Sequence, residues 1–331
     1  MAMNLDLLSI GDCNMDAFIN PSESESLCNI NTKECLIAFS YADKIPVKSL
    51  DFSVGGNAAN NAVGASRLGI KCGLVLTLGD DSIGNQIVES LKKEEVDLTY
   101  VIQQPATNSN FNVVLTYSGE RTIFTYHAPR SYEFPVQLPR VSYVYLTSMG
   151  ESYMPFYNHM VEWLLKNPEI KLVFNPGSWQ LKEKSETVDK VMKLAHTIFV
   201  NKQEAEKLTG FAAKDFVSRE LLLALSALGP KVSVITDGGV GAYAFDGANF
   251  FHCPPLPVDA FERTGAGDAF GSGFLSAQIK GKSLDECLVW GSVNSASVIG
   301  YTGAQRGLLK ENDIDIWVER FKSSGVKVDE M

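Results

Sequence analysis

The sequence predicts an α/β fold, in which a doubly wound, mostly parallel sheet is flanked by helices and carries a small β-sheet lid. Short apolar runs typical of buried strands recur along the 331 residues, and stretches with a helical spacing of apolar side chains lie between them. Such alternation places helices on both faces of a parallel sheet. Two β-rich segments interrupt the alternation and predict the lid.

The strands of the main sheet are predicted from short continuous apolar runs, which indicate buried strands. They are Leu5–Ile10, Cys72–Leu78, Val141–Leu146, Leu172–Phe174, Thr197–Val200 and Val232–Ile235. The helices are predicted where apolar side chains recur every three or four residues. They are Ala58–Leu68, Ser82–Glu94, Pro155–Lys166, Thr187–Ala195, Asp215–Leu228, Ala269–Lys280 and Leu284–Ile299.

The lid is predicted in residues 17–52 and 111–127, where the helical period is lost. Within it, Phe111–Tyr117 and Thr122–Tyr126 are joined by Ser118-Gly119-Glu120-Arg121, which is typical of a hairpin. Without an internal repeat or a long linker, the chain is expected to form a single domain, residues 1–331, that carries this lid. A lid sheet exposes an edge and a face that a second subunit could cover, so a homodimer through the lid is a candidate assembly.

The composition is that of an ordinary globular protein, with 45% hydrophobic and 21% charged residues. The 39 acidic and 29 basic residues give a net charge of −10 without a basic cluster, so no nucleic-acid partner is expected. The first ten residues lack the basic and apolar segments of a targeting or membrane-spanning sequence, so we expect no membrane partner and a cytoplasmic location. The six cysteines lack zinc-ligand spacing and are expected to be reduced, mostly buried thiols.

The most informative segment for chemistry is Thr264-Gly265-Ala266-Gly267-Asp268, directly ahead of a predicted helix. Small residues there let successive backbone N–H groups point outward, and the helix dipole favours an anion. The same dipole predicts a low pKa for Asp268. Asp268 is either a helix cap, a common role for Asp, or a base beside an anion site, an arrangement that serves phosphoryl transfer.

Two other nucleotide-binding patterns fit this region poorly. The dinucleotide fingerprint G-x-G-x-x-G needs a glycine where Phe270 stands, which argues against a nicotinamide oxidoreductase. Gly281-Lys282-Ser283 ends like a Walker A loop, but Ser276 replaces the first glycine of that motif. A second glycine turn, Gly55-Gly56-Asn57-Ala58-Ala59-Asn60-Asn61, opens an Ala-rich helix, and its asparagines either serve caps and turns or bind sugar hydroxyls.

Together, the two glycine turns resemble the paired motifs of the ribokinase (PfkB) family of carbohydrate kinases. Further matches in the family's order occur at Gly11–Asp16, Asn201–Glu204, Thr236–Gly241 and Asn294, so the resemblance covers roughly Leu5 to Leu309. It implies a doubly wound α/β domain with a β-lid. It also implies transfer of the γ-phosphate of MgATP to a sugar or nucleoside hydroxyl.

The resemblance implies a role for each matching residue. Asp268 would be the general base, and Gly265, Ala266 and Gly267 would form the anion site. Asp16, Gly56, Asn57 and Asn60 would bind substrate hydroxyls. Asn201 and Glu204 would organise Mg²⁺ and the phosphates, partly through water. Thr236, Gly238 and Gly241 would lie along the phosphates of ATP, and Asn294 would lie near the adenine. Structural alternatives are a helix start at Glu204 and plain turns at Asp16 and at Thr236.

The chain departs from the family pattern D-T-T-G-A-G-D at Glu262 and Arg263. Glu262 stands where members activated by a monovalent cation have Asp, so activation by K⁺ is in doubt. Arg263 adds a positive charge beside the anion site, where it either contacts a phosphate or pairs with Glu262. Asn57 stands where ribokinases often carry Lys, so ribose itself is not implied.

The leading hypothesis is therefore an ATP-dependent kinase that phosphorylates a hydroxyl of a small sugar or sugar derivative. A nucleoside kinase is the alternative within the same chemistry, and Phe39, Phe111 and Tyr126 of the predicted lid could contact the nucleobase. A catalytically silent sugar- or nucleotide-binding relative is the alternative outside it. The retained base, anion site and N-x-x-E pattern argue against that last hypothesis.

Overall fold

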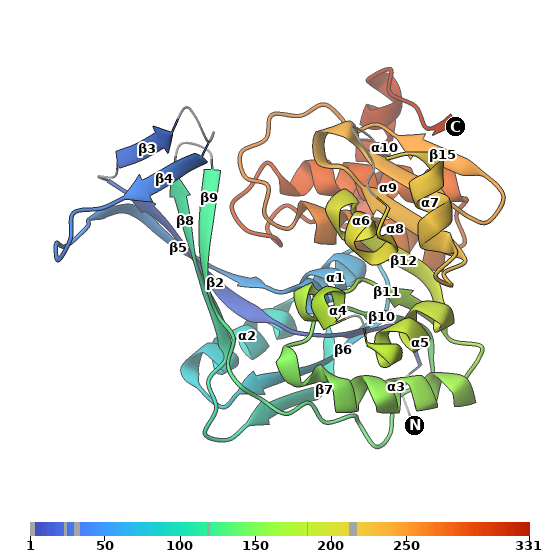
Figure 1. The fold of residues 1–331 in the computed structure, drawn as a ribbon, viewed down its shortest axis with the longest axis horizontal. Coiled ribbons are helices and arrows are strands. Elements are labelled where there is room, and N and C mark those ends of the chain that lie inside the picture. Colours follow the sequence, from blue (N-terminus) through green and yellow to red (C-terminus); the bar gives the residue numbers. More distant parts are fainter. Residues whose placement is uncertain (1–3, 23–24, 30–33, 118–119, 184, 212–216) are drawn as a thin grey trace.

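The computed structural model describes residues 4–22, 25–29, 34–117, 120–183, 185–211 and 217–331. Among these residues, ten strands form the central sheet in the order β16-β15-β14-β13-β12-β11-β10-β1-β6-β7 (Figure 1). Pairing is parallel from β7 to β13 and antiparallel from β13 to β16. The strands are β1 (Leu5–Ile10), β6 (Cys72–Gly79), β7 (Asp97–Gln104), β10 (Val141–Leu146), β11 (Lys171–Phe174), β12 (Ala195–Asn201), β13 (Val232–Thr236), β14 (Ala242–Phe245), β15 (Phe250–Cys253) and β16 (Asp329–Glu330).

Helices cover both faces of this sheet, which confirms the predicted doubly wound fold (Figure 1). One apolar core joins the sheet through Leu7 to α1 (Asn57–Arg67), α2 (Ser82–Lys93), α8 (Ala266–Ile279), α9 (Leu284–Val298) and α10 (Glu311–Ser323). The other joins it through Leu8 to α3 (Met154–Lys166), α5 (Glu186–Leu194), α6 (Lys202–Thr209) and α7 (Arg219–Ser226). Neighbouring residues of β1 thus point to opposite faces, as the pleat of a strand requires.

Two predicted helices begin three or more residues away from the predicted start. The helix predicted from Ala269 begins at Ala266, so Asp268 lies inside the first turn of α8 instead of ahead of it. The helix predicted at Asp215–Leu228 is α7, which runs from Arg219 to Ser226, and Asp215 lies outside the described residues.

A smaller sheet, which we call the lid sheet, extends from one side of the body (Figure 1). It has the order β5-β2-β8-β9, formed by Val47–Gly55, Asn14–Pro21, Asn110–Tyr117 and Glu120–Tyr126. The β8–β9 hairpin was predicted, although Ser118 and Gly119 of its turn lie outside the described residues. A further pair, β3 (Glu25–Asn29) and β4 (Glu34–Ala38), forms a two-stranded ribbon.

The two faces of the lid sheet differ in chemistry. Asp16 pairs with Asn112 of β8, so both side chains lie on one face, which is polar at this point. The neighbouring row, Phe52, Ala17, Val113 and Phe124, lies on the opposite face. Phe52 is 53% exposed and Phe124 is 59% exposed, so the second face presents apolar side chains to solvent.

Candidate active site

The site is built on two helices that each begin at a glycine. Gly56 precedes α1 with φ 94° and Gly265 precedes α8 with φ 77°, and neither helix start is capped by a side chain. A Cβ atom at Gly265 would lie 2.3 Å from the Cβ of Ala304, so only glycine fits there. The first N–H groups of a helix have no partner within the helix. Both helix starts therefore offer backbone donors and a positive dipole end to an anion.

Asp268 and Asn60 meet between these two helices. The side-chain amide of Asn60 donates a 2.7 Å hydrogen bond to Oδ2 of Asp268. The pKa of Asp268 is raised to about 6. Burial is the largest cause, the Asn60 hydrogen bond lowers the pKa, and the negative charges of Glu204 and Asp16 raise it. The predicted low pKa is therefore wrong, because the loss of hydration at this position outweighs the favourable end of the helix dipole.

Asp16 lies on β2 and is buried, with 6% of its surface exposed. Its Oδ1 accepts hydrogen bonds from the side-chain amides of Asn14 and, at 2.9 Å, of Asn112. Burial raises the pKa of Asp16, these two hydrogen bonds lower it, and the charge of Glu262 raises it. The side-chain oxygen of Asn112 is buried and has no hydrogen-bond partner among the described residues. A buried carboxylate and a free amide oxygen on one face call for a ligand that donates hydrogen bonds.

Sequence reasoning missed Asn14 and Asn112 as parts of this cluster. The signal for Asn112 is a polar residue inside an otherwise apolar run of β8, at a position directly opposite Asp16. Asn175 was also missed. The side-chain amide of Asn57 donates to its Oδ1 at 3.2 Å, and so does the hydroxyl of Tyr145 at 3.1 Å. Asn57 is thereby fixed at the carboxyl ends of the central strands, where open α/β sheets bind ligands.

Asn201 and Glu204 form a capping box at the start of α6. The Glu204 N–H donates to Oδ1 of Asn201 and the Asn201 N–H donates to Oε2 of Glu204, each at 2.9 Å. Burial raises the pKa of Glu204, while the hydrogen bonds of the cap lower it. The structural interpretation of this pair is thus observed directly. Among the described residues, groups of three or more His, Cys, Asp and Glu that could hold a metal ion are absent.

The expected nucleotide-binding residues fall into two groups. Thr236 ends β13, and Gly238 and Gly241 follow it in a turn with φ 49° and 113°. Apart from the two chain neighbours, the described residues place no atom within 4 Å of a Cβ added at Gly238, so this turn is open. Asn294, in contrast, is fully enclosed. Its amide donates to the carbonyl of Ala269 at 2.8 Å and its oxygen accepts from the Leu309 N–H at 2.9 Å. The side chain of Asn294 thus ties α9 to α8, and the expected contact with adenine stays a prediction.

Glu262 connects the glycine turn to the lid sheet. Its Oε1 accepts from the backbone N–H of Thr264 at 2.7 Å and pairs with the guanidinium of Arg121, on β9, at 2.9 Å. The pairing of Glu262 with Arg263 that was considered from the sequence is therefore replaced by a pairing with Arg121. Arg263 itself is exposed.

Two cavities lie beside these candidate site residues. One of about 400 Å³ lies between α1, α2 and β5 and is lined by residues that include Arg67, Glu94 and Gln305. The other, of about 200 Å³, is lined by residues that include Asp12, Arg130, Tyr132 and Trp179. A Cβ at Gly56 would lie 2.7 Å from the carbonyl oxygen of Asp12, so the second cavity adjoins the first glycine turn.

Comparison with known proteins decides the family. A model of the pfkB family of carbohydrate kinases matches residues 4–311. The chain belongs to this family. The ATP-dependent 6-phosphofructokinase of Thermoanaerobacterium thermosaccharolyticum is 28% identical to this carbohydrate kinase over 281 residues, which cover 81% of this chain and 86% of that protein.

Solved structures show the same ribokinase-like fold. The ribokinase of Arabidopsis thaliana, solved with ribose and ATP, matches with a TM-score of 0.79 at 20% identity, covering 96% of this chain and 99% of that one. The nucleoside kinase of Burkholderia thailandensis, solved with inosine, matches with a TM-score of 0.76 at 18% identity, covering 97% and 99%. In the part of this carbohydrate kinase that the structure describes, helices of the length and apolarity needed to cross a membrane are absent.

Proposed function

We propose that this carbohydrate kinase transfers the γ-phosphate of ATP to a hydroxyl of a small sugar or sugar derivative, with Asp268 as general base. The observation that carries the proposal is the position of Asp268, in the first turn of a helix whose glycine-led start is uncapped. A carboxylate and backbone amide donors thus share one turn, in which the N–H of Ala266 also donates a long hydrogen bond, 3.4 Å, to the carbonyl of Arg263. The carboxylate accepts the proton of the attacking hydroxyl while the amides hold the transferring phosphate.

The raised pKa of Asp268 supports this assignment. A general base works best when its pKa lies near the operating pH, because it must be ionised before the reaction and still basic enough to take a proton. With a pKa of about 6, Asp268 is ionised at neutral pH and is a stronger base than an ordinary Asp. The hydrogen bond from Asn60 holds Oδ2 in one place and leaves Oδ1 for the acceptor hydroxyl.

The acceptor is proposed to lie between the two glycine turns and the polar face of the lid sheet. The Asp16 carboxylate and the free oxygen of Asn112 accept hydrogen bonds from its hydroxyls. Gly56, Asn57 and Asn60 complete the site from α1. The lid sheet closes over the acceptor and excludes water that would otherwise attack ATP.

The phosphate donor is proposed to bind along the second glycine turn. The amides of Gly265, Ala266 and Gly267 contact the transferring phosphate, and Thr236, Gly238 and Gly241 contact the remaining phosphates. Glu204, with Asn201, holds Mg²⁺ through water, since its capping box already uses one carboxylate oxygen. When bound, Mg²⁺ neutralises charge on the phosphates. Asn294 supports the site indirectly, by fixing α8 against α9.

A nucleoside acceptor is the second candidate, and the cavity of about 200 Å³ favours it. Trp179 and Tyr132 in its lining present aromatic surface close to the first glycine turn. The inosine complex of the structurally similar nucleoside kinase is in keeping with such an acceptor. Phosphate transfer to free sugars but not to nucleosides would exclude this candidate.

The test is a side-by-side assay in which purified protein and MgATP are offered free sugars, phosphosugars and nucleosides in separate reactions. We expect one class to gain a phosphoryl group, detected by mass spectrometry together with acceptor-dependent ADP formation. Asp268→Asn is the control, since it keeps the size of the side chain and removes the base. Binding of ATP and an acceptor without transfer would instead favour the silent relative.

We also propose a homodimer that covers the apolar face of the lid sheet, because Phe52 and Phe124 are more than half exposed there.

A cytoplasmic location is proposed from the cysteine thiols. Cys13, Cys72, Cys253 and Cys287 are free and buried, which fits a reducing compartment.

A further inference from the structure

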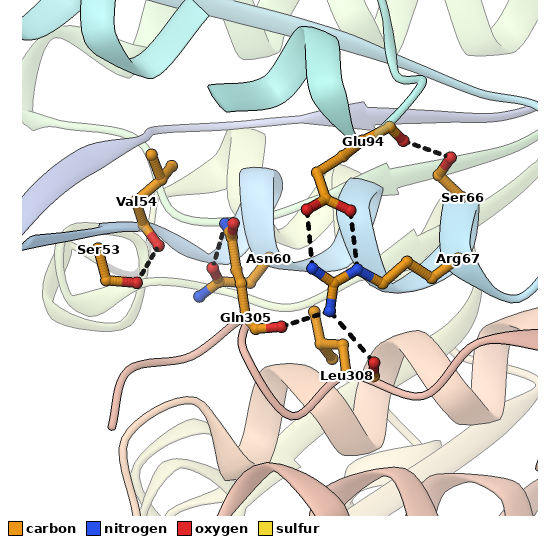
Figure 2. A network of polar contacts seen from close by, with 8 residues as sticks. All are labelled: Ser53, Val54, Asn60, Ser66, Arg67, Glu94, Gln305 and Leu308. Carbon is orange, nitrogen blue, oxygen red and sulfur yellow. Dashed lines mark hydrogen bonds and ion pairs between the residues drawn. The ribbon is translucent and has the colours of Figure 1, made fainter. Parts of the chain in front are cut away.

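A chain of hydrogen bonds runs from the candidate base to the surface, and Figure 2 shows its part from Asn60 to Glu94. Asn60, which donates to Asp268, accepts through its Oδ1 a 3.0 Å hydrogen bond from the side-chain amide of Gln305. The backbone carbonyl of Gln305 in turn accepts from Arg67 at 2.6 Å. Arg67 forms a two-pronged ion pair with Glu94, with both distances 2.7 Å. Four polar contacts therefore connect Asp268 to the end of α2.

We propose that Gln305 is a positioning residue for the base and acts through Asn60. A side-chain amide has a donor end and an acceptor end, and Asn60 stabilises the ionised form of Asp268 only while its donor end faces the carboxylate. Gln305 presents an N–H to the other end of Asn60, and this contact favours the orientation in which the amide of Asn60 faces Asp268. Gln305 is 7% exposed and Asn60 is 2% exposed, so both side chains are buried, where a hydrogen bond is stronger than in water.

The backbone of Gln305 is held tightly enough to perform this task. Arg67 donates to the backbone carbonyls of both Gln305 and Leu308, so the loop is held at these two residues (Figure 2). The Cβ of the preceding residue, Ala304, lies 2.3 Å from the position that a Cβ on Gly265 would occupy. One short loop thus contacts both the start of α8, through Ala304, and the side chain of Asn60 that faces Asp268, through Gln305. The role of Gln305 in catalysis rests on the proposed function of Asp268, whereas its effect on the Asp268 pKa does not.

The experiment compares Gln305→Met with the native enzyme. Met keeps the length of the side chain and fills the same space but donates no hydrogen bond. We expect the Asp268 pKa to rise by at least half a unit, both in the pH profile of kcat/KM and in a ¹³C carboxyl titration of the free enzyme. We expect kcat to fall roughly ten- to a hundredfold, because the base is no longer held in one orientation. The KM for ATP should stay within about twofold.

A matched control exists elsewhere in the chain. Gln103 donates a 3.0 Å hydrogen bond to the side-chain oxygen of Asn85 in an exposed amide pair of the same kind, so Gln103→Met should alter none of these quantities. A double-mutant cycle isolates the route of the effect. Asn60→Leu alone should raise the Asp268 pKa, and adding Gln305→Met to Asn60→Leu should produce no further rise.

The proposal is overturned if Gln305→Met leaves the titration of Asp268 unchanged, or if its effect persists in the Asn60→Leu background. Because the ¹³C titration needs no turnover, it decides the matter even if Asp268 proves not to be the base. Should Gln305→Met fail to fold, Gln305→Glu provides the same test. It replaces the donor by an acceptor of equal size, and the pKa of Asp268 should rise further than with Met.

Discussion

The side-chain amide of Asn60 lies 2.7 Å from the carboxylate of Asp268, although 208 residues separate the two in sequence. One residue belongs to the helix that follows the first glycine turn, and the other to the helix that follows the second. The contact therefore joins the side of the site proposed for the acceptor to the side proposed for phosphate. It also stabilises the ionised carboxylate against a buried environment that disfavours it.

The pH dependence of turnover should follow this carboxylate. A base is active only when deprotonated, so kcat/KM for the acceptor should fall tenfold per pH unit below a pKa of about 6 and level off above it. The measurement is a pH profile of kcat/KM with MgATP saturating at every pH. An acid limb near pH 4, the ordinary range for Asp, would contradict the role of the buried environment.

Asp268→Asn should keep the fold and lower kcat by roughly two to four orders of magnitude. It should also change stability in a pH-dependent way. The folded-state pKa of Asp268 is raised from 3.8 to about 6, so its contribution to the free energy of unfolding is greatest below pH 4 and is lost as pH rises through 6. At pH 8 the asparagine variant should be more stable by up to about 3 kcal/mol, and this gain should vanish near pH 4. Thermal unfolding at the two pH values checks both.

The two glycines of the α8 turn should respond differently to alanine. Gly265→Ala forces a left-handed φ of 77° on alanine and a clash with Ala304, so it should lower stability by at least about 1 kcal/mol and reduce activity. Beyond its own turn of helix, Gly267→Ala meets no atom of the described residues within 4 Å. Stability should therefore hold or rise while activity falls, because the methyl group enters the space proposed for phosphate. Full activity in Gly267→Ala would show that the phosphate lies elsewhere.

The ion pair between Arg121 and Glu262 should affect substrate binding more than stability. Arg121 is 38% exposed, and pairs of this kind contribute at most about 1 kcal/mol. Arg121→Ala loosens the lid sheet at the glycine turn, so KM for the acceptor should rise severalfold with a smaller change in kcat. Arg306→Ala removes the weaker and more exposed contact of Arg306 with Asp51 and serves as the comparison. Equal KM values in both variants and the native enzyme would mean that the Arg121 pair is incidental.

The proposed dimer can be tested on a single strand. Phe124→Lys places a charge on the apolar face of the lid sheet, whereas Ile123→Lys places it on the opposite face and is nearly as exposed in the native chain. We expect Phe124→Lys to halve the mass measured by light scattering and Ile123→Lys to leave it unchanged. A native protein that already has the mass of one chain would end the proposal.

The fold was predictable where burial is uniform along an element. The runs Leu5–Ile10 and Val141–Leu146 are strands with the predicted ends, because both are covered on each face and carry almost only apolar residues. The edge strand β7 was missed since its residues are half-buried and show no apolar run. The helix α10 was missed because only Ile314 and Phe321 of its thirteen residues are buried.

The site was predictable to the extent that it is local. Each glycine turn is a short contiguous motif, so the sequence indicated both of them and the chemistry that they suit. Contacts between distant segments, such as that of Asn112 with Asp16, produce no pattern in the sequence from which they could be predicted. The pKa of Asp268 was predicted with the wrong sign, because a helix start is visible in the sequence and the burial around it is not.

The uncapped starts of α1 and α8 have a consequence for how the protein persists in a cell. A good side-chain cap contributes about 1 kcal/mol to a helix, and both starts forgo it. An anion bound there supplies the missing acceptor, so resistance to heat and proteolysis rises with ligand concentration by mass action. If the phosphate donor binds there as proposed, the lifetime of this kinase would track the supply of its own substrate.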